Sequence, residues 1–255
     1  MTRENHSGGE GNRKMDHGTK DSTPRRLMRL VITIIAVAMS LYHLVYVSGL
    51  FIRLGIPIMA VPHRAASLGF TVLLIFLLYP ATKKFLVFDA VLSLGCVAAC
   101  GYYVINFDQV IVDITRYGAA TPTELVFALF MIIGIFEAAR RVIGLAMPLI
   151  MACFFLYTLF SNHFPGILRG TGAGLDRAAA FVLLSPEGLF GLPMAVGATI
   201  IIMFVLFGQF LNSSGGGKFF IDLSSSLFGH FRGGPAKVSV VASALFGSIN
   251  GSTAA

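Results

Sequence analysis

Long apolar runs, separated by short loops that contain lysine and arginine, dominate this sequence. A helix that spans a bilayer needs roughly 20 mostly apolar residues, and six runs approach or reach this length. They are Leu27–Leu50, Ala65–Tyr79, Phe85–Ile105, Glu124–Ala139, Val142–Phe160 and Leu192–Leu211. We therefore predict an all-α integral membrane protein with about six transmembrane helices.

Composition agrees with a membrane protein and argues against a nucleic-acid-binding one. Hydrophobic residues make up 56% of the 255-residue chain and charged residues only 12%, about half of the roughly 25% found in soluble domains. The net charge of +7 would indicate nucleic acid only if the basic residues gathered on one soluble face. Most of them lie instead in short loops beside apolar runs. We therefore predict a lipid bilayer around this chain and no nucleic-acid partner.

The distribution of Lys and Arg predicts the orientation in the membrane, because basic residues concentrate in cytoplasmic loops. If the N-terminus is cytoplasmic, six crossings place 14 of the 19 basic residues inside. The five outside are Arg53, Arg64, Arg116, Arg169 and Arg177. We therefore predict a multi-pass protein with a cytoplasmic N-terminus. Residues 1–26 are polar and rich in glycine, which predicts a disordered cytosolic tail.

Two segments between the apolar runs have helical patterns of their own. Leu175–Leu184 is apolar but too short to cross a membrane, so we expect an interfacial helix there. Phe219–Phe231 has apolar residues at helical spacing, which predicts an amphipathic helix at the cytosolic surface. This second segment lies between glycines at 215–217 and Pro235. It is either a simple linker or an arm that attaches a moving domain.

Charged side chains near the apolar runs predict structural ion pairs. Glu137 lies three and four residues before Arg140 and Arg141, a spacing at which side chains on one helix face meet. Asp89 lies one turn into the third run, where we expect it to face Lys83 or Lys84; the alternative is a functional acid within the membrane.

The remaining polar residues give no catalytic pattern. His43 lies inside the first run beside two tyrosines, where we expect a hydrogen bond between helices rather than a proton relay. The cysteines have neither a CxxC nor a Cys/His metal spacing, and we interpret them as small core residues. They are Cys96, Cys100 and Cys153. Without a nucleophile–base set, a phosphate-binding loop or paired carboxylates, nothing indicates an enzyme.

The last apolar stretch, Val238–Ile249, is too short to span and leads into small and hydroxyl residues. We interpret it as half of a re-entrant hairpin or as a truncated helix. Glycine frees the backbone from helical geometry, and irregular backbone at membrane depth occurs only where protein or a water-filled cavity surrounds it. Freed carbonyls together with Ser, Thr and Asn oxygens would suit a small cation such as Na⁺.

The candidate ion and substrate site therefore lies at this C-terminal tip. Its residues are Gly247, Ser248, Asn250, Gly251, Ser252 and Thr253, with Na⁺ at Ser248, Asn250 and Ser252. The alternative interpretation is a Gly/Ser surface against which another helix packs.

Phe207–Ala255 resembles the beginning of the large membrane subunit of tripartite ATP-independent periplasmic (TRAP) transporters. The resemblance rests on a helix end, a Gly-rich turn, an amphipathic helix, the motif RGGPAK (232–237) and the closing motif GSINGSTA (247–254). Asn250 stands where the family pattern has Ser. Two upstream stretches, Phe136–Gly144 and Leu184–Pro193, resemble the fused form in which small and large subunits share one chain. Within the family, these stretches resemble the branch that works with TAXI-type binding proteins.

The resemblance implies a secondary transporter of the elevator type in the bacterial inner (plasma) membrane. A periplasmic solute-binding protein would deliver a small organic anion, and Na⁺ would be the coupling ion, with no other cofactor. The Gly/Ser tip would belong to the first re-entrant hairpin and would line the ion and substrate sites.

The resemblance also implies a division of the chain. Residues 27–141 would form a small-subunit-like four-helix membrane region. Residues 142–234 would begin the large-subunit region, with two spanning helices and the arm helix, and residues 235–255 would be the first half of the re-entrant hairpin. Because the family pattern continues beyond this point, we expect a truncated elevator-type transporter that is inactive alone. The alternative function is a structural or accessory scaffold subunit without a solute site of its own.

Overall fold

The computed structural model describes residues 23–80, 86–112, 121–185 and 187–250, and every regular element in these ranges is a helix. The helices are α1 (Thr23–Val47), α2 (Leu50–Arg53), α3 (Ala60–Leu78), α4 (Leu86–Ile105), α5 (Phe107–Val112), α6 (Pro122–Val142), α7 (Ala146–Phe160), α8 (Leu175–Leu184), α9 (Leu192–Val196), a π-helical segment (Gly197–Ile201), α10 (Ile202–Ser213), α11 (Gly216–Phe228) and α12 (Gly234–Asn250). Residues 1–22 of the expected tail lie outside the described residues, and residues 23–26 belong to α1.

Five helices in the described part of the chain are long and apolar enough to cross a membrane. They are Arg26–Val47, Ala60–Leu78, Val87–Ile105, Ala146–His163 and the continuous rod Leu192–Ser213. The fourth predicted run also forms a helix, α6, but it is not one of these five. Four charged residues on α6, at its two ends, distinguish it from the others. The prediction of an all-α integral membrane protein is thus confirmed, with five candidate spans.

One group of helices contains nearly all of the buried core. We call α3, α4, α6 and α8 the packed group, because they pack against one another and supply most of the fully buried apolar side chains. Cys96 and Cys100 lie in this core, as predicted. Cys153 on α7 is exposed, so the prediction of a core position is wrong for it. The reason is that α7 contacts only α6 and, more weakly, α8.

Helix α8 differs from the interfacial helix that the sequence predicted. It forms over the expected residues, but its face of three alanines at 178–180 and two leucines is buried. This face packs on α6, and the small alanine side chains let the two helices approach closely. Leu175 and Phe181 on its other face stay exposed.

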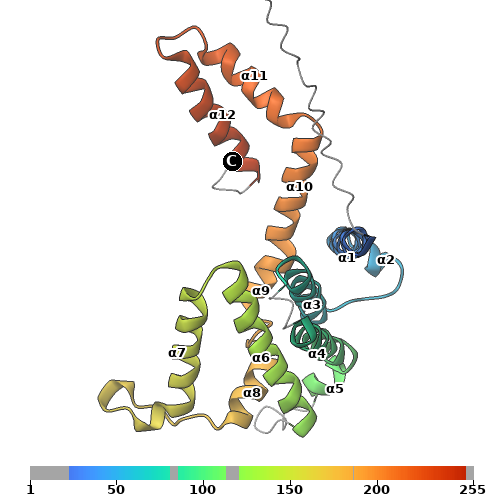
Figure 1. The fold of residues 1–255 in the computed structure, drawn as a ribbon, viewed down its shortest axis with the longest axis vertical. Coiled ribbons are helices and arrows are strands. Elements are labelled where there is room, and N and C mark those ends of the chain that lie inside the picture. Colours follow the sequence, from blue (N-terminus) through green and yellow to red (C-terminus); the bar gives the residue numbers. More distant parts are fainter. Residues whose placement is uncertain (1–22, 81–85, 113–120, 186, 251–255) are drawn as a thin grey trace, which may run out of the picture.

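The C-terminal arm, defined here as α10, α11 and α12, projects away from the other helices (Figure 1). Gly215 joins α10 to α11 with φ +88°, and Gly233 precedes α12 with φ +75°, a backbone region that favours glycine. The two turns fold α11 and α12 side by side, and α12 also touches α10. The predicted amphipathic helix Phe219–Phe231 is therefore present as α11, and it ends at Phe228.

Candidate functional site

The predicted tip residues begin on a regular helix. Helix α12 continues to Asn250, so the irregular backbone that we expected at Gly247 and Ser248 is not found there. The Ser248 hydroxyl donates a hydrogen bond of 2.8 Å to the Leu245 carbonyl of the same helix. The hydroxyl hydrogen is used within its own helix, and the two lone pairs of the oxygen remain available to a donor or a cation.

The rest of the candidate tip is not placed. Asn250 is the last residue of α12, and Gly251, Ser252 and Thr253 lie outside the described residues. The structure therefore brings Gly247, Ser248 and the Asn250 backbone onto one helix end. The Na⁺ set at Ser248, Asn250 and Ser252 stays a prediction.

A buried polar cluster connects α1, α3 and the π-helical segment. His43 of α1 bonds through Nε2 to the Ser67 hydroxyl of α3. His63 of α3 bonds through Nε2 to the Ala198 carbonyl at 3.2 Å and through Nδ1 to the Tyr42 hydroxyl at 3.1 Å. Both histidine side chains are fully buried. The predicted hydrogen bond from His43 to another helix is thus confirmed.

The partners of the two imidazoles determine where the protons sit. His43 Nδ1 faces the Met39 carbonyl at 2.7 Å, and a carbonyl can only accept, so Nδ1 carries the hydrogen and Nε2 accepts from Ser67. By the same argument His63 donates from Nε2 to Ala198 and accepts from Tyr42 at Nδ1. All four ring nitrogens are satisfied by neutral rings, so the cluster fits a structural connection.

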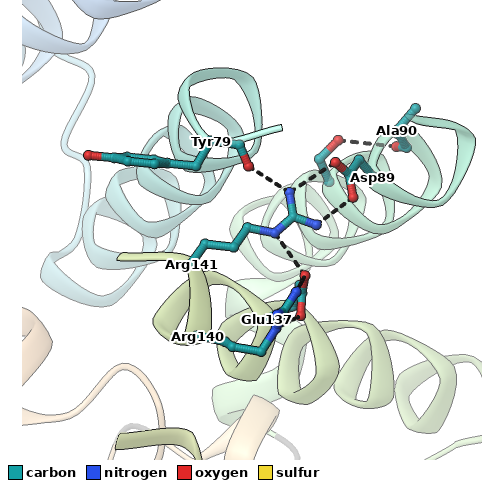
Figure 2. A network of polar contacts seen from close by, with 7 residues as sticks. Tyr79, Asp89, Ala90, Glu137, Arg140 and Arg141 are labelled. Atoms are coloured by element: carbon teal, nitrogen blue, oxygen red, sulfur yellow. Dashed lines mark hydrogen bonds and ion pairs between the residues drawn. The ribbon is translucent and has the colours of Figure 1, made fainter. Parts of the chain in front are cut away.

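A second buried network joins the ends of α3, α4 and α6 (Figure 2). The Arg141 guanidinium donates to both carboxylate oxygens of Asp89, at 2.9 and 2.5 Å, and to the Tyr79 carbonyl at 2.9 Å. Glu137 accepts from Arg141 at 2.8 Å and from Arg140 at 2.6 Å. The Glu137 pairs were predicted. The lysines at 83 and 84, expected beside Asp89, lie outside the described residues.

The surroundings of Arg141 keep it charged. Its side chain is only 6% exposed and its guanidinium lies 4.5 Å from the centre of the Phe76 ring. The hydrogen bonds to Asp89, and then to Glu137, raise the pKa of Arg141 above its ordinary value. The network therefore contains compensated charges at one end of the packed group, and it joins α3, α4 and α6 there.

The C-terminal half of the chain matches a known family. A family model described as "Tripartite ATP-independent periplasmic transporter, DctM component" matches residues 127–255, just over half of the sequence. The chain belongs to the TRAP transporter family. The sequence resemblance to the large membrane subunit is thus confirmed.

One curated protein adds to this match. The "C4-dicarboxylate TRAP transporter large permease protein DctM" of Pseudomonas aeruginosa is 33% identical over 89 residues, which cover 32% of this chain and 21% of that protein. The chain thus spans about a fifth of the length of this relative. No solved structure matches the chain.

The TRAP match begins inside α6 and includes α7 to α12 and the tip. It starts 15 residues before the predicted boundary at 141/142. Helices α1 to α5 lie outside the matched range, so the fused form, the TAXI branch and the small-subunit-like role of residues 27–141 stay predictions.

Besides the Arg141 network, side-chain donors of the unmatched helices connect them to the segment between α8 and α10 of the TRAP-matched part. His63 bonds to the Ala198 carbonyl, Arg64 to the Phe190 carbonyl at 2.8 Å, and Tyr103 to the Leu184 carbonyl at 3.3 Å. All three acceptors lie between the end of α8 and the π-helical segment. These bonds fix the two parts of the chain to each other.

The sequence analysis missed His63 and Arg64 because it began the second span at Ala65. Helix α3 instead begins at Ala60. The signal that could have shown this is Pro62, since proline is favoured in the first turn of a helix. The role of Ala198 could not have been predicted from the sequence, because its backbone carbonyl is the acceptor and every residue type has that group.

Proposed function

We propose that this chain is a membrane component of a Na⁺-coupled TRAP transporter that takes up small organic anions delivered by a periplasmic solute-binding protein. The observation that carries the proposal is the family match, which runs through the whole C-terminal arm and the Gly/Ser tip. The name of the Pseudomonas aeruginosa relative supports a dicarboxylate as the first anion to test. The candidate spans support an inner-membrane location, and the Lys and Arg distribution favours an N-terminus on the cytoplasmic side.

In this proposal the tip oxygens bind the coupling ion. Ser248, Asn250 and Ser252 would supply hard oxygen ligands, and Gly247 and Gly251 would let backbone carbonyls approach the ion. Ser248 could bind the ion while its hydroxyl still donates to the Leu245 carbonyl, because the oxygen keeps its lone pairs.

The test is anion uptake by the native host. We expect a strain without this gene to lose Na⁺-dependent uptake of a C4-dicarboxylate, and the wild-type gene to restore it. Genes that encode Ser248→Ala or Ser252→Ala should restore less uptake and shift the Na⁺ dependence to higher concentration. Ser239→Ala is the matched control, because the Ser239 hydroxyl also bonds only to its own helix but lies away from the tip. Uptake that is unchanged in the deletion strain would refute the proposal.

We expect the 255-residue chain alone to give no uptake in proteoliposomes, because its match covers only 21% of the relative. A scaffold role is the second candidate, and the packed group with its compensated buried charges favours it. Under that role the deletion strain would lose a partner subunit from the membrane, while Ser248→Ala and Ser252→Ala would have no effect.

A further inference from the structure

A large apolar cavity lies between α6, α7 and α8, apart from the tip and from both polar networks. Its volume is about 840 Å³, and apolar side chains such as Ile135, Phe154 and Phe181 form most of its wall. This volume is within the roughly 300–1,000 Å³ typical of small-molecule sites. The cavity is therefore large enough for a ligand and not merely a packing defect.

The cavity is open to whatever surrounds the protein. Phe154 and Phe181 line it and yet remain 67% and 54% exposed, so its mouth is not covered by the described part of the chain. The chain belongs to a family of membrane transporters, so lipid acyl chains can reach this mouth. An empty apolar cavity would forfeit the dispersion contacts of its lining, and an acyl chain can restore them.

One end of the cavity carries a cation. Arg177 lies in the first turn of α8 and lines the cavity together with Thr158, near the end of α7. The two helices meet there, because the Ala173 amide donates to the Thr158 carbonyl at 3.1 Å. Arg177 is exposed, and no ion pair between it and another described residue occurs. A phosphodiester group could therefore approach it.

The acidic residues near the cavity lie elsewhere. Glu187 lines it after the C-terminal end of α8, whereas Arg177 lies in the first turn of that helix. Asp176 is the chain neighbour of Arg177 but does not line the cavity. The cavity thus has a basic end next to an apolar wall, which is the polarity of an anionic phospholipid.

We propose that the α6–α7–α8 cavity binds one anionic phospholipid, with an acyl chain against α6 and α7 and the phosphate at Arg177. This inference is independent of the proposed transport function, because it concerns residues remote from the tip. A lipid at this position would fill the space between α7 and the packed group, to which α7 is otherwise joined on one side only.

The absence of tryptophan from the chain allows a clean test. Phe154→Trp places a fluorescent reporter in the cavity wall, and Cys153→Trp places one at almost the same depth on the exposed side of α7, away from the cavity. Each purified variant would be titrated in detergent with brominated phosphatidylglycerol. We expect F154W to be quenched saturably at about one lipid per chain, and C153W to be little quenched at the same ratio.

The role of Arg177 is tested in the F154W background. Arg177→Gln should weaken the apparent affinity about tenfold, in the range of one lost charge-assisted hydrogen bond, while Arg177→Lys retains most of it. Arg169→Gln, an exposed arginine outside the cavity lining, is the control and should change nothing. Equal quenching of F154W and C153W, or equal affinity for brominated phosphatidylcholine, would overturn the proposal.

Discussion

The packed group and the C-terminal arm are both helical and both apolar, yet they are held together differently. About 39% of the residues in the spans of α3 and α4 are buried, against 11% in the rod that leads into the arm. The packed group also contains buried charges that are compensated by partners on other helices. The arm has almost no buried core, and one of its few buried polar atoms, Ser224 Oγ, has no partner among the described residues.

This difference shows which contacts can be changed at low cost. In the packed group a side chain often has partners on two or three helices, so its loss leaves several groups uncompensated. In the arm most side chains meet only a neighbouring helix or the surroundings. The described start of the TRAP-matched tip, Gly247 to Asn250, lies at the end of α12 in the arm.

The largest expected effect comes from Arg141. Arg141→Met should lower the free energy of unfolding by about 3–5 kcal/mol, because it leaves the buried Asp89 carboxylate without its partner. Thermal unfolding in detergent would measure this. Arg140→Met is the matched control: it is the chain neighbour, it also pairs with Glu137, but its side chain is 49% exposed, so we expect little change. Similar losses in both variants would contradict the buried network.

His63 tests the connection between the packed group and the π-helical segment that precedes the arm. His63→Phe keeps a ring against Tyr46, whose ring stacks on it at 3.4 Å, but removes the bonds to Tyr42 and Ala198. The buried Ala198 carbonyl and the partly buried Tyr42 hydroxyl then lose this partner, at about 1–3 kcal/mol for a buried group, so we expect a loss of about 2–4 kcal/mol.

Hydrogen exchange would show where His63→Phe acts. Amide protection should fall most in the rod 192–213, because the Ala198 carbonyl lies there. His163→Phe, at an exposed histidine, serves as the control. Unchanged protection in the rod would mean that the His63 bond does not hold it.

Sequence reasoning predicted the apolar helices well, since length and hydropathy decide them. It predicted local pairs such as Glu137 with Arg140 for the same reason, because both partners lie on one helix. It could not predict that Asp89 pairs with Arg141, which is 52 positions away. It misjudged α8, because an amphipathic pattern does not say whether protein or lipid covers the apolar face.

The candidate site was predicted from residue types and from the resemblance, and only in part tested. The family match confirms what the tip belongs to, whereas the ligand roles of its residues rest on oxygen atoms whose partners a single sequence cannot reveal. Ser248 illustrates this, because its hydroxyl donates to its own helix while its oxygen lone pairs could accept from another donor or bind an ion.

Gly134 and Gly101 allow a comparison between a helix surface in close contact with a neighbouring helix and an open one. A Cβ atom on Gly134 of α6 would lie 2.2 Å from Cys96 Sγ of α4, whereas one on Gly101 of α4 would meet nothing within 4 Å. Gly134→Ala should therefore cost about 1–3 kcal/mol of unfolding free energy. Gly101→Ala should gain up to about 1 kcal/mol from helix propensity. The unfolding midpoint of each variant would be measured. If both midpoints move in the same direction, α4 and α6 are not in close contact at Gly134.

The smallest expected effect has the opposite sign and concerns the arm. Ser224→Ala removes a hydroxyl that is fully buried and unpaired within the described residues, and an unsatisfied buried polar group costs about 1–3 kcal/mol. We therefore expect a gain of about 1 kcal/mol, seen as a higher unfolding temperature of the arm. Ser239→Ala, at an exposed hydroxyl bonded to its own helix, should change little. A loss of stability in the Ser224→Ala variant would show that its hydroxyl is used, and that the arm contains a polar contact comparable to those of the packed group.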